Sequence, residues 1–403
     1  MTEETTTTLT GQGPPVPGSA ACAPDGTEAD PVPAEPIHVG PLTRIRLPHG
    51  EGVAWLATRY EDVRLITGDP RFSRAEVTDR RASGPHAGPR PGSLAWADPP
   101  EHDRLSKQVA GAFSAAAMKR MRPRARRVLG ALVDGLLADG PPADLLTRVL
   151  EPFPVIVVSE VMGVPVADRE QVHSWARRIL APDGPAGEEA ERRLYDWIAQ
   201  TIRGRAHSTG DDVYSLLGAA VSRGEIDEEE AAGLAGPLQL AGETVTGFCG
   251  RMFLLLLTRP ELMERARDAE RRGPLLDELL RYVPHRGGTG PARVALDDVD
   301  VHGVRVARGD RVYVSYPAAC RDPAVFPDPD RVYPARAPNP HLAFGNGPHS
   351  CTGALLARMQ TDLLVDTLPR RLPGLRLAVP PDEIPRRDGT AGGGPRALPC
   401  RWD

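Results

Sequence analysis

The ten residues FGNGPHSCTG, from Phe344 to Gly353, combine three glycines with a cysteine and precede a run of apolar residues at helical spacing. A glycine-rich loop fits a phosphate-binding loop or a plain turn, and a lone cysteine before a helix is commonly a small buried side chain. At the N-terminus of a helix, however, the dipole and the free N–H groups stabilise a thiolate. The stretch therefore has three interpretations, and the rest of the chain decides between them.

The residues around Cys351 support a thiolate that binds iron. Three glycines let the backbone approach a flat ligand closely, and they are Gly345, Gly347 and Gly353. His349 can reach an anionic group, and Phe344 can pack beside the sulfur and limit access of water. This set of side chains suits a thiolate bound axially to heme iron.

Composition indicates a soluble enzyme-sized protein. The chain has 403 residues, of which 40% are hydrophobic. Its formal net charge of −5 does not indicate a protein that binds nucleic acid. No apolar run reaches the length of a membrane span, since MFLLLL from Met252 to Leu257 is far too short. The first ten residues lack the pattern of a signal peptide. We therefore expect a cytoplasmic protein that binds neither membrane nor nucleic acid.

The five cysteines are odd in number and widely spaced. The sequence contains no CxxC pair and no Cys/His pair at zinc spacing, so neither a disulfide framework nor a structural zinc site is expected. Each cysteine has to be judged alone, and only Cys351 lies in a loop whose neighbours suit a metal ligand.

Residues 1–38 are rich in Thr, Pro and Gly, which predicts disorder, and residues 39–403 are expected to form a single domain. Residues 75–92 predict a long mobile loop. Helices are expected over 101–117, 123–139, 143–162, 167–180, 186–206, 211–222, 227–258 and 352–371. Short strands are expected at Thr43–Leu47, Val53–Ala57, Arg293–Leu296, Val299–Val301 and Arg311–Ser315. The predicted fold class is mainly α with small β-sheets at the margins.

The cysteine loop resembles the heme loop of the cytochrome P-450 superfamily, specifically its soluble bacterial members. The loop of that family reads F-x-x-G-x-x-x-C-x-G, and Phe344, Gly347, Cys351 and Gly353 match its fixed positions. The resemblance implies a heme b (iron protoporphyrin IX) with Cys351 as the axial ligand of its iron. It also implies that the heme lies between a long central helix and the cysteine loop with its following helix.

Further motifs of the family occur in the expected order. Glu278 and Arg281 match its E-x-x-R, although a pair at this spacing is by itself also typical of an exposed helix face. FPDPDR, residues 326–331, matches the segment that supplies a third member of this buried network, here Arg331. ADPPEHDRL, residues 97–105, resembles the start of the family's helix C, so that His102, together with Arg293, would contact the heme propionates.

Two smaller departures from the family pattern lie near these motifs. Many bacterial members carry Arg four residues after the histidine that corresponds to His102, and here that position is Ser106. Arg104 and Lys107 are the candidates to compensate for this missing charge, so the propionate contact on this side stays open. Val332 replaces a common Phe, from which only a change in packing is expected.

LAGETVTGF, residues 240–248, resembles the central helix I, where the usual pattern is Ala-Gly-x-acid-Thr-Thr. Ala241 and Gly242 match, and Ala241 would lie against the heme. The acid position then holds Thr244, and Val245 stands where the oxygen-activating threonine is usual, followed by Thr246. A slip of one residue would give Glu243 the acid role and Thr244 the alcohol role, but it would displace the Ala-Gly match.

This departure bears on the reaction, because cleavage of the O–O bond requires delivery of two protons. With Val245 at the iron, protons would come through ordered water, Thr244 or polar groups of the substrate. Ordinary hydroxylation through water and radical coupling of two aromatic partners, through a new C–C or C–N bond, both remain open.

The resemblance implies a monooxygenase that uses O2 and electrons from a ferredoxin and its ferredoxin reductase, and that works as a monomer. A basic run could attract an acidic redox partner or could simply be a solvated face. It consists of Lys119, Arg120, Arg122, Arg124, Arg126 and Arg127.

Substrate contacts are expected from a lid over residues 75–97, from the central helix and from the loop 284–293. The named candidates are Leu240, Glu243, Thr244, His285, Arg286 and Thr289. The polar residues of the loop favour a secondary metabolite such as an aromatic amino-acid-derived amide or a cyclic dipeptide, although His285 and Arg286 could also face solvent and propionate. The alternatives are a macrolide or polyketide hydroxylase, a peroxide-driven peroxygenase, and a heme-binding module that performs no oxidation.

Overall fold

The computed structural model describes residues 39–46, 52–77, 90–180, 185–284, 289–386 and 394–403. The segment expected to be disordered, residues 1–38, lies outside the described residues, as does most of the expected lid. The described chain is mainly helical with small sheets, which confirms the predicted fold class.

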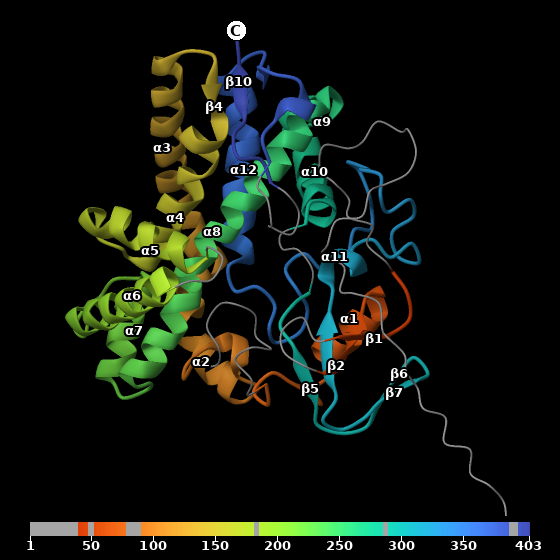
Figure 1. The fold of residues 1–403 in the computed structure, drawn as a ribbon. Helices are drawn as coiled ribbons and strands as arrows, with labels where there is room; N and C mark the ends of the chain where they lie inside the picture. The colour runs from red at the N-terminus through yellow and green to blue at the C-terminus, as the bar shows by residue number, and fades with distance from the viewer. Residues whose placement is uncertain (1–38, 47–51, 78–89, 181–184, 285–288, 387–393) are drawn as a thin grey trace, which may run out of the picture.

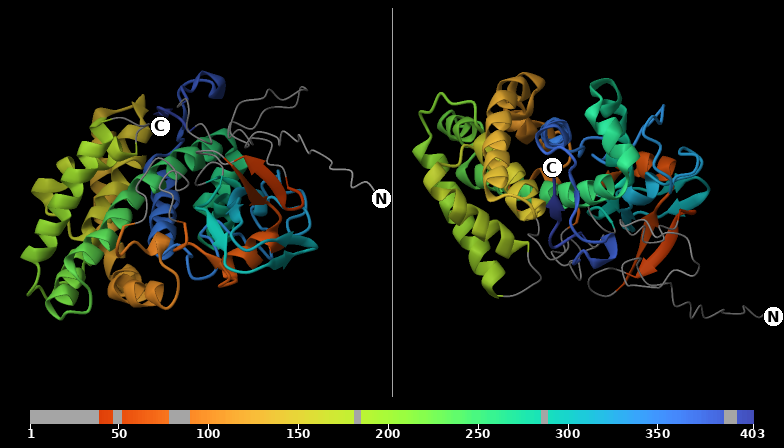
Figure 2. Two further views of the ribbon diagram at one scale, coloured as in Figure 1. Left: turned by 60° about the horizontal axis from the view of Figure 1, so that its bottom comes forward. Right: turned by 90° about the horizontal axis from the view of Figure 1, so that it is seen from above.

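The long helices form one side of the molecule and the largest sheet forms the other (Figure 1). The helices are α1 (Tyr60–Gly68), α2 (Glu101–Val109), α3 (Ala115–Asp139), α4 (Pro152–Met162), α5 (Arg169–Ile179), α6 (Pro185–Gly204), α7 (Val213–Ser222), α8 (Glu228–Thr258), α9 (Pro260–Arg267), α10 (Ala269–Tyr282), α11 (Tyr316–Ala319) and α12 (Ala354–Arg371). Figure 2 shows the same division from two further directions.

The strands form three small sheets. They are β1 (Thr43–Arg46), β2 (Val53–Ala57), β3 (Phe72–Ser73), β4 (Ala143–Asp144), β5 (Arg293–Ala295), β6 (Val299–Val301), β7 (Val304–Val306), β8 (Arg311–Val314), β9 (Arg376–Leu377) and β10 (Pro399–Arg401). The largest sheet has the order β1-β2-β8-β5-β3, in which β2 and β8 are parallel and their register pairs Leu56 with Tyr313. The other sheets are β4-β10-β9 and the hairpin β6-β7.

Helix α8 crosses the helical side of the molecule and begins at a capping box (Figure 1). The Glu230 N–H donates to the Asp227 carboxylate at 2.8 Å, and the Asp227 N–H donates to the Glu230 carboxylate at 3.0 Å. Two free N–H groups of the first turn are thereby satisfied, which fixes the start of the helix. The predicted helix over 227–258 is confirmed.

Helix α8 is also the one helix in the described ranges that is long and apolar enough to cross a bilayer by length and composition. Of the window that meets this test, 61% is buried inside the protein. The core helix of a globular protein has the same character, so this helix gives little support for a membrane span.

The segment 143–162 differs from the single helix that its periodicity predicts. Ala143 and Asp144 instead form β4, which pairs with β10 near the C-terminus. A π-helical turn, Leu146–Leu150, follows, and α4 begins at Pro152. Pairing with a strand distant in sequence overrides the local helical pattern, and Pro152 suits a first helical position because it lacks an N–H.

Helix α3 begins earlier than predicted, and α2 ends sooner. The Ser114 hydroxyl accepts a hydrogen bond from the Ala117 N–H at 3.2 Å and caps α3, so that Pro123 lies inside the helix instead of at its start. Between the two helices, Ala110–Phe113 form a 3₁₀ turn. The apolar spacing carries through the turn, which is why the sequence pattern does not reveal the break.

Candidate active site

The cysteine loop is held by backbone hydrogen bonds immediately before α12. The Cys351 N–H donates to the Phe344 carbonyl at 2.7 Å, and Gly353 is the residue before the first helical residue. Gly347 has a φ of 73°, and a Cβ there would lie 2.2 Å from the Thr67 carbonyl oxygen. Only glycine fits such a position, so this loop conformation depends on Gly347.

A pocket of about 400 Å³ lies between α8 and the cysteine loop. Cys351, which the sequence analysis proposed as an iron ligand, lines this pocket. The same holds for other residues of the loop, namely Phe344, Gly345, His349 and Gly353. The thiol therefore faces a space bounded on its far side by the central helix, as the sequence analysis expects for a heme site.

One face of α8 lines this pocket through Leu238, Ala241, Thr244, Val245 and Phe248. These positions recur at helical spacing, which brings their side chains to the same side of the helix. Val245 thus stands in the pocket where a hydroxyl is usual in the family, and Thr244 supplies a hydroxyl beside it. Ala241 on the same face fits the register without the slip, and Thr244 lines the pocket in either register.

Three sequence-predicted residues of α8 do not line the pocket. Glu243 lies on another face, where its Oε1 is 2.6 Å from Nδ1 of His173 on α5. Thr246 is buried and donates to the Glu243 carbonyl at 2.7 Å. Leu240 packs against the hydrophobic core. The predicted substrate contacts of Leu240 and Glu243 are therefore corrected, and Leu238 takes the place of Leu240.

From the loop after α10, Thr289 lines the pocket as predicted. His285 and Arg286 lie outside the described residues. From the region expected to form a lid, Leu94 and Ala95 also reach the pocket. The described part of this region thus contributes to the pocket wall.

His102 on α2 and His349 of the cysteine loop meet at one end of the pocket, with ring centroids 4.8 Å apart and both rings buried. Burial lowers the pKa of His349 to about 4, despite a hydrogen bond to Asp98 that acts in the opposite direction. His349 is therefore neutral near pH 7 and can donate a hydrogen bond without adding charge.

Two buried arginines lie near the same end. Arg293 on β5 is 1% exposed, and its Nη2 has no hydrogen-bond partner among the described residues. Arg74, which lines the pocket, is 5% exposed, and its Nε likewise has no partner within the described ranges. Burial, and secondly the nearby charge of Arg293, lowers the pKa of Arg74 to about 9.

Unsatisfied buried guanidinium groups are costly, and two that repel each other are stabilised by an anionic ligand. The pair of propionates on a heme supplies such charges, so the residues present fit this group. Arg74 is missing from the sequence-based candidates because it lies in a loop, where no periodic pattern marks it. The other proposed cations do not fill this role: Arg104 pairs with Glu101 and Glu230, and Lys107 is exposed.

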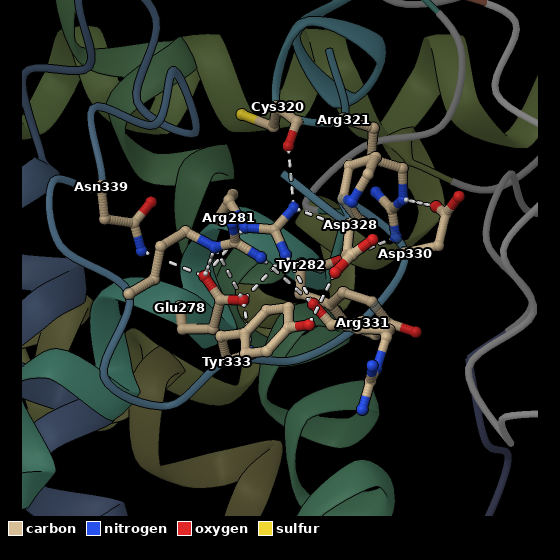
Figure 3. Close-up of polar contacts among 12 residues, drawn as sticks. Glu278, Arg281, Tyr282, Cys320, Arg321, Asp328, Asp330, Arg331, Tyr333 and Asn339 are labelled. Carbon is tan, nitrogen blue, oxygen red and sulfur yellow. Dashed lines mark hydrogen bonds and ion pairs between the residues drawn. The ribbon is translucent and has the colours of Figure 1, made fainter. Parts of the chain in front are cut away.

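The predicted pair of Glu278 and Arg281 is fully buried (Figure 3). Two parallel hydrogen bonds of 2.8 Å join the guanidinium to the carboxylate. Arg281 also donates to the carbonyl groups of Cys320 and Pro329 at 2.9 Å. This network ties α10 to the coil that precedes the cysteine loop, which excludes the interpretation as an exposed surface pair.

The third side chain of the network is Arg336, not Arg331 as predicted. Nε of Arg336 lies 3.2 and 3.1 Å from the two Glu278 oxygens. Arg331 offers only its carbonyl to Arg281, at 3.2 Å, and its own side chain points away from Glu278 toward the Tyr333 ring (Figure 3). The segment is irregular coil with a left-handed residue, Asp328, so sequence spacing does not determine which arginine turns inward.

With this fold and site, the chain belongs to the cytochrome P450 family, whose model matches residues 274–387. It is 64% identical to biflaviolin synthase CYP158A1 of Streptomyces coelicolor over 408 residues that cover 100% of both chains. It is 39% identical to the mycinamicin IV hydroxylase/epoxidase of Micromonospora griseorubida over 368 residues, 90% of this chain and 92% of that one. The crystal structure of cytochrome P450mel 107F1 with biaryl coupling reactivity has a TM-score of 0.83 at 39% identity, covering 90% of this chain and 93% of that chain.

The family confirms three predictions made from the sequence. The protein is a cytochrome P450 monooxygenase, its cofactor is heme b, and it uses a substrate, O2 and redox partners. Bound heme supplies oxygen activation, and the residues that would hold it are Cys351 at the iron and the group of Arg74, His102, Arg293 and His349 at the propionates. The alternative of a heme-binding module without oxidation is excluded, because the family and its named relatives are oxygenases.

Proposed function

We propose that this protein joins two hydroxylated aromatic polyketide molecules by oxidative coupling. Full-length identity of 64% to a biflaviolin synthase supports the proposal, as does likeness to a solved cytochrome P450 with biaryl coupling reactivity. Coupling of two aromatic partners is also one of the two outcomes that the sequence of α8 leaves open.

The observation that carries the proposal is Val245 on the pocket face of α8. A valine cannot hold a proton or orient a water where the family usually places a threonine hydroxyl. Of the residues on this face, only Thr244 offers a hydroxyl, so hydroxyl groups of a polar aromatic substrate would complete the proton path. A substrate that supplies its own acidic hydroxyls suits such a pocket.

The proposed overall reaction balances. One hydrogen leaves each aromatic molecule and one bond forms between them, which releases two electrons and two protons. Two further electrons and two protons arrive from the redox partner and water, and together these reduce one O2 to two water molecules. The protein's part is to bind the two rings and control water in the apolar pocket.

Product analysis tests the proposal. Purified heme-loaded protein is supplied with flaviolin, O2, and a ferredoxin with its reductase, and products are separated by mass. Coupling predicts a product of twice the substrate mass less two hydrogens. A monomer that has gained one oxygen, with no dimer, would refute it. Val245→Thr serves as the matched variant, and we expect it to shift products toward the hydroxylated monomer.

A second candidate function is macrolide hydroxylation, which the 39% identity to a mycinamicin IV hydroxylase/epoxidase favours. The same assay with a macrolide in place of flaviolin distinguishes the two. The cyclic dipeptide expectation rests mainly on His285 and Arg286, of which the structure gives no placement, so a cyclic dipeptide belongs in the panel as a third substrate class.

We further propose that residues 39–403 work as one monomeric domain in the cytoplasm, with a ferredoxin and its reductase as electron donors. The bacterial relatives support this arrangement. Peroxide-driven catalysis is the rival, because a pocket without the usual threonine need not depend on ordered proton delivery. Product formed with hydrogen peroxide alone, at a rate equal to that with ferredoxin, would favour the rival.

A further inference from the structure

A second cavity, of about 610 Å³, lies where α3, α4 and the start of α5 meet, and Val161 separates it from the heme pocket by lining both. Its wall on α3 carries Arg120, Arg124 and Arg127, whose spacing places them on one face of the helix. Apolar side chains, including Met121 and Val128, line the cavity beside these arginines. The cavity thus combines cationic groups with an apolar surface.

The opposite rim is fixed by tight packing. Gly163 ends α4 with a φ of 86°, and a Cβ there would lie 2.0 Å from the Asp212 carboxylate. Arg205 donates to the Gly163 carbonyl at 2.9 Å and to the Asp212 carboxylate at 3.2 Å. These contacts within the protein therefore fix the shape of this rim without a ligand.

The cations of the cavity differ in whether they have partners. Arg120 pairs with Asp211 at 2.7 Å, and Arg205 pairs with Asp212. Arg124 and Arg127 make no hydrogen bond or ion pair with any residue that the structure describes. Both residues are exposed at the wall of the cavity, and their guanidinium groups are free to bind an anion there.

Glu160 supplies a hydrogen-bond acceptor for a ligand in the same cavity. This residue of α4 lines the cavity, and its side chain is 20% exposed. Its Oε1 lies 3.8 Å from Nη1 of Arg169, whereas its buried Oε2 has no hydrogen-bond partner within the described part of the chain. A buried carboxylate oxygen without a donor is costly, and a hydroxyl of a ligand would satisfy it.

We propose that this cavity is a second binding site, for a small aromatic molecule with an anionic group at one end and a hydroxyl at the other. The anionic group binds Arg124 and Arg127, the ring lies on the apolar surface, and the hydroxyl donates to Glu160. Hydroxylated aromatic acids have this chemistry. The proposal does not depend on which substrate the heme pocket accepts.

The charges argue against an acidic protein as the occupant. Three carboxylates, Glu160, Asp211 and Asp212, share the cavity with the arginines and would repel a broad acidic surface. The basic run seen in the sequence is also divided, because Arg122 turns away to pair with Asp362 on α12. A small molecule can place its anionic and hydroxyl ends apart, whereas an extended acidic surface cannot.

Calorimetric titration of the heme-loaded protein with 6-hydroxy-2-naphthoate tests the proposal, with 4-phenylimidazole present to fill the heme pocket. We expect one remaining site. R124Q/R127Q should weaken binding by about tenfold or more, because two charged hydrogen bonds are lost. The control is R126Q, since Arg126 is exposed on the same helix like Arg124 and Arg127 but does not line the cavity.

A second comparison tests the hydroxyl. Wild-type protein should bind 6-hydroxy-2-naphthoate more tightly than 2-naphthoate, and Glu160→Gln should reduce that difference. Absence of binding while the heme pocket is filled, or equal weakening by R126Q and R124Q/R127Q, would overturn the proposal. If R124Q/R127Q binds the naphthoate normally but is reduced more slowly by ferredoxin, the cavity serves a protein partner and the proposal is wrong.

Discussion

Among single residues, Arg74 shows most directly how the pocket is prepared for an anionic cofactor. It is buried beside Arg293, and both guanidinium groups retain nitrogen atoms without partners among the described residues. Because burial and the like charge of Arg293 both disfavour the Arg74 cation, an anionic group beside the two guanidinium groups would stabilise them.

Replacement of Arg74 should therefore affect the two forms of the protein in opposite directions. We expect Arg74→Met to weaken heme binding by about tenfold while raising the melting temperature of the heme-free protein. Heme affinity is measured by transfer to a heme-binding acceptor protein, and melting by circular dichroism. Arg71→Met is the control, since Arg71 is 48% exposed and pairs with Asp69. Equal heme affinity in both variants would contradict the assignment.

The two arginines near Glu278 give a second comparison of single residues. Arg336 is 7% exposed and contacts both Glu278 oxygens, whereas Arg331 is exposed and contacts neither. We expect Arg336→Ala to lower the free energy of unfolding by about 3 kcal/mol, because it leaves part of a buried carboxylate without its partner. Arg331→Ala should change it by less than about 0.5 kcal/mol. Denaturant titration checks both, and the reverse order would restore the sequence-based assignment.

At the scale of elements, α8 is a helix whose bounds can be predicted from local sequence alone. Its start is set by the Asp227–Glu230 capping box and its length by apolar periodicity, and both are visible in the sequence. The segment 143–162 shows the opposite case, since β4 forms by pairing with β10, more than two hundred residues later. No local pattern contains that information, so periodicity predicts one helix where the protein has a strand, a π-helical turn and α4.

The capping box at the start of α8 is expected to contribute to the stability of the protein. Asp227→Ala removes the acceptor for the Glu230 N–H, which we expect to cost about 1 kcal/mol of stability. Glu229→Ala is the control, because Glu229 lies in the same acidic first turn but takes no part in the box. Denaturant unfolding compares them, and an equal loss in both variants would mean that first-turn charge, not the cap, stabilises the helix.

At the scale of the whole molecule, the sequence yields those features of the active site that lie within one motif. Phe344, Gly347 and Cys351 share a loop, and Val245 is placed by the helix that carries it. Arg74 and Arg336 come from coil that other elements fold into place, so their roles depend on tertiary structure. The same holds for the cavity beside α3, which four separate segments enclose.

Long-range ion pairs join the helices that surround the site. Asp362 on α12 binds Arg122 of α3 and, at 2.9 Å, Arg272 of α10, which also lies 2.8 Å from Asp366. Arg272 is only 14% exposed, and Asp362 is 24% exposed. Such half-buried networks exceed isolated surface pairs in strength, since solvent screens them less.

Loss of the ion pairs that Asp362 makes with Arg122 and Arg272 should weaken the packing of α12, the helix that follows the cysteine loop. We expect Asp362→Asn to lower the free energy of unfolding by about 2 kcal/mol and to speed heme release, because two arginines lose a shared carboxylate. Asp134→Asn is the matched control: it breaks the Arg371–Asp134 pair between the same two helices, whose side chains are 42% and 67% exposed, and should cost less than about 1 kcal/mol. If the two variants release heme equally fast, the ion-pair network does not hold α12 against the heme, and hydrophobic packing of α3 against α12 alone must do so.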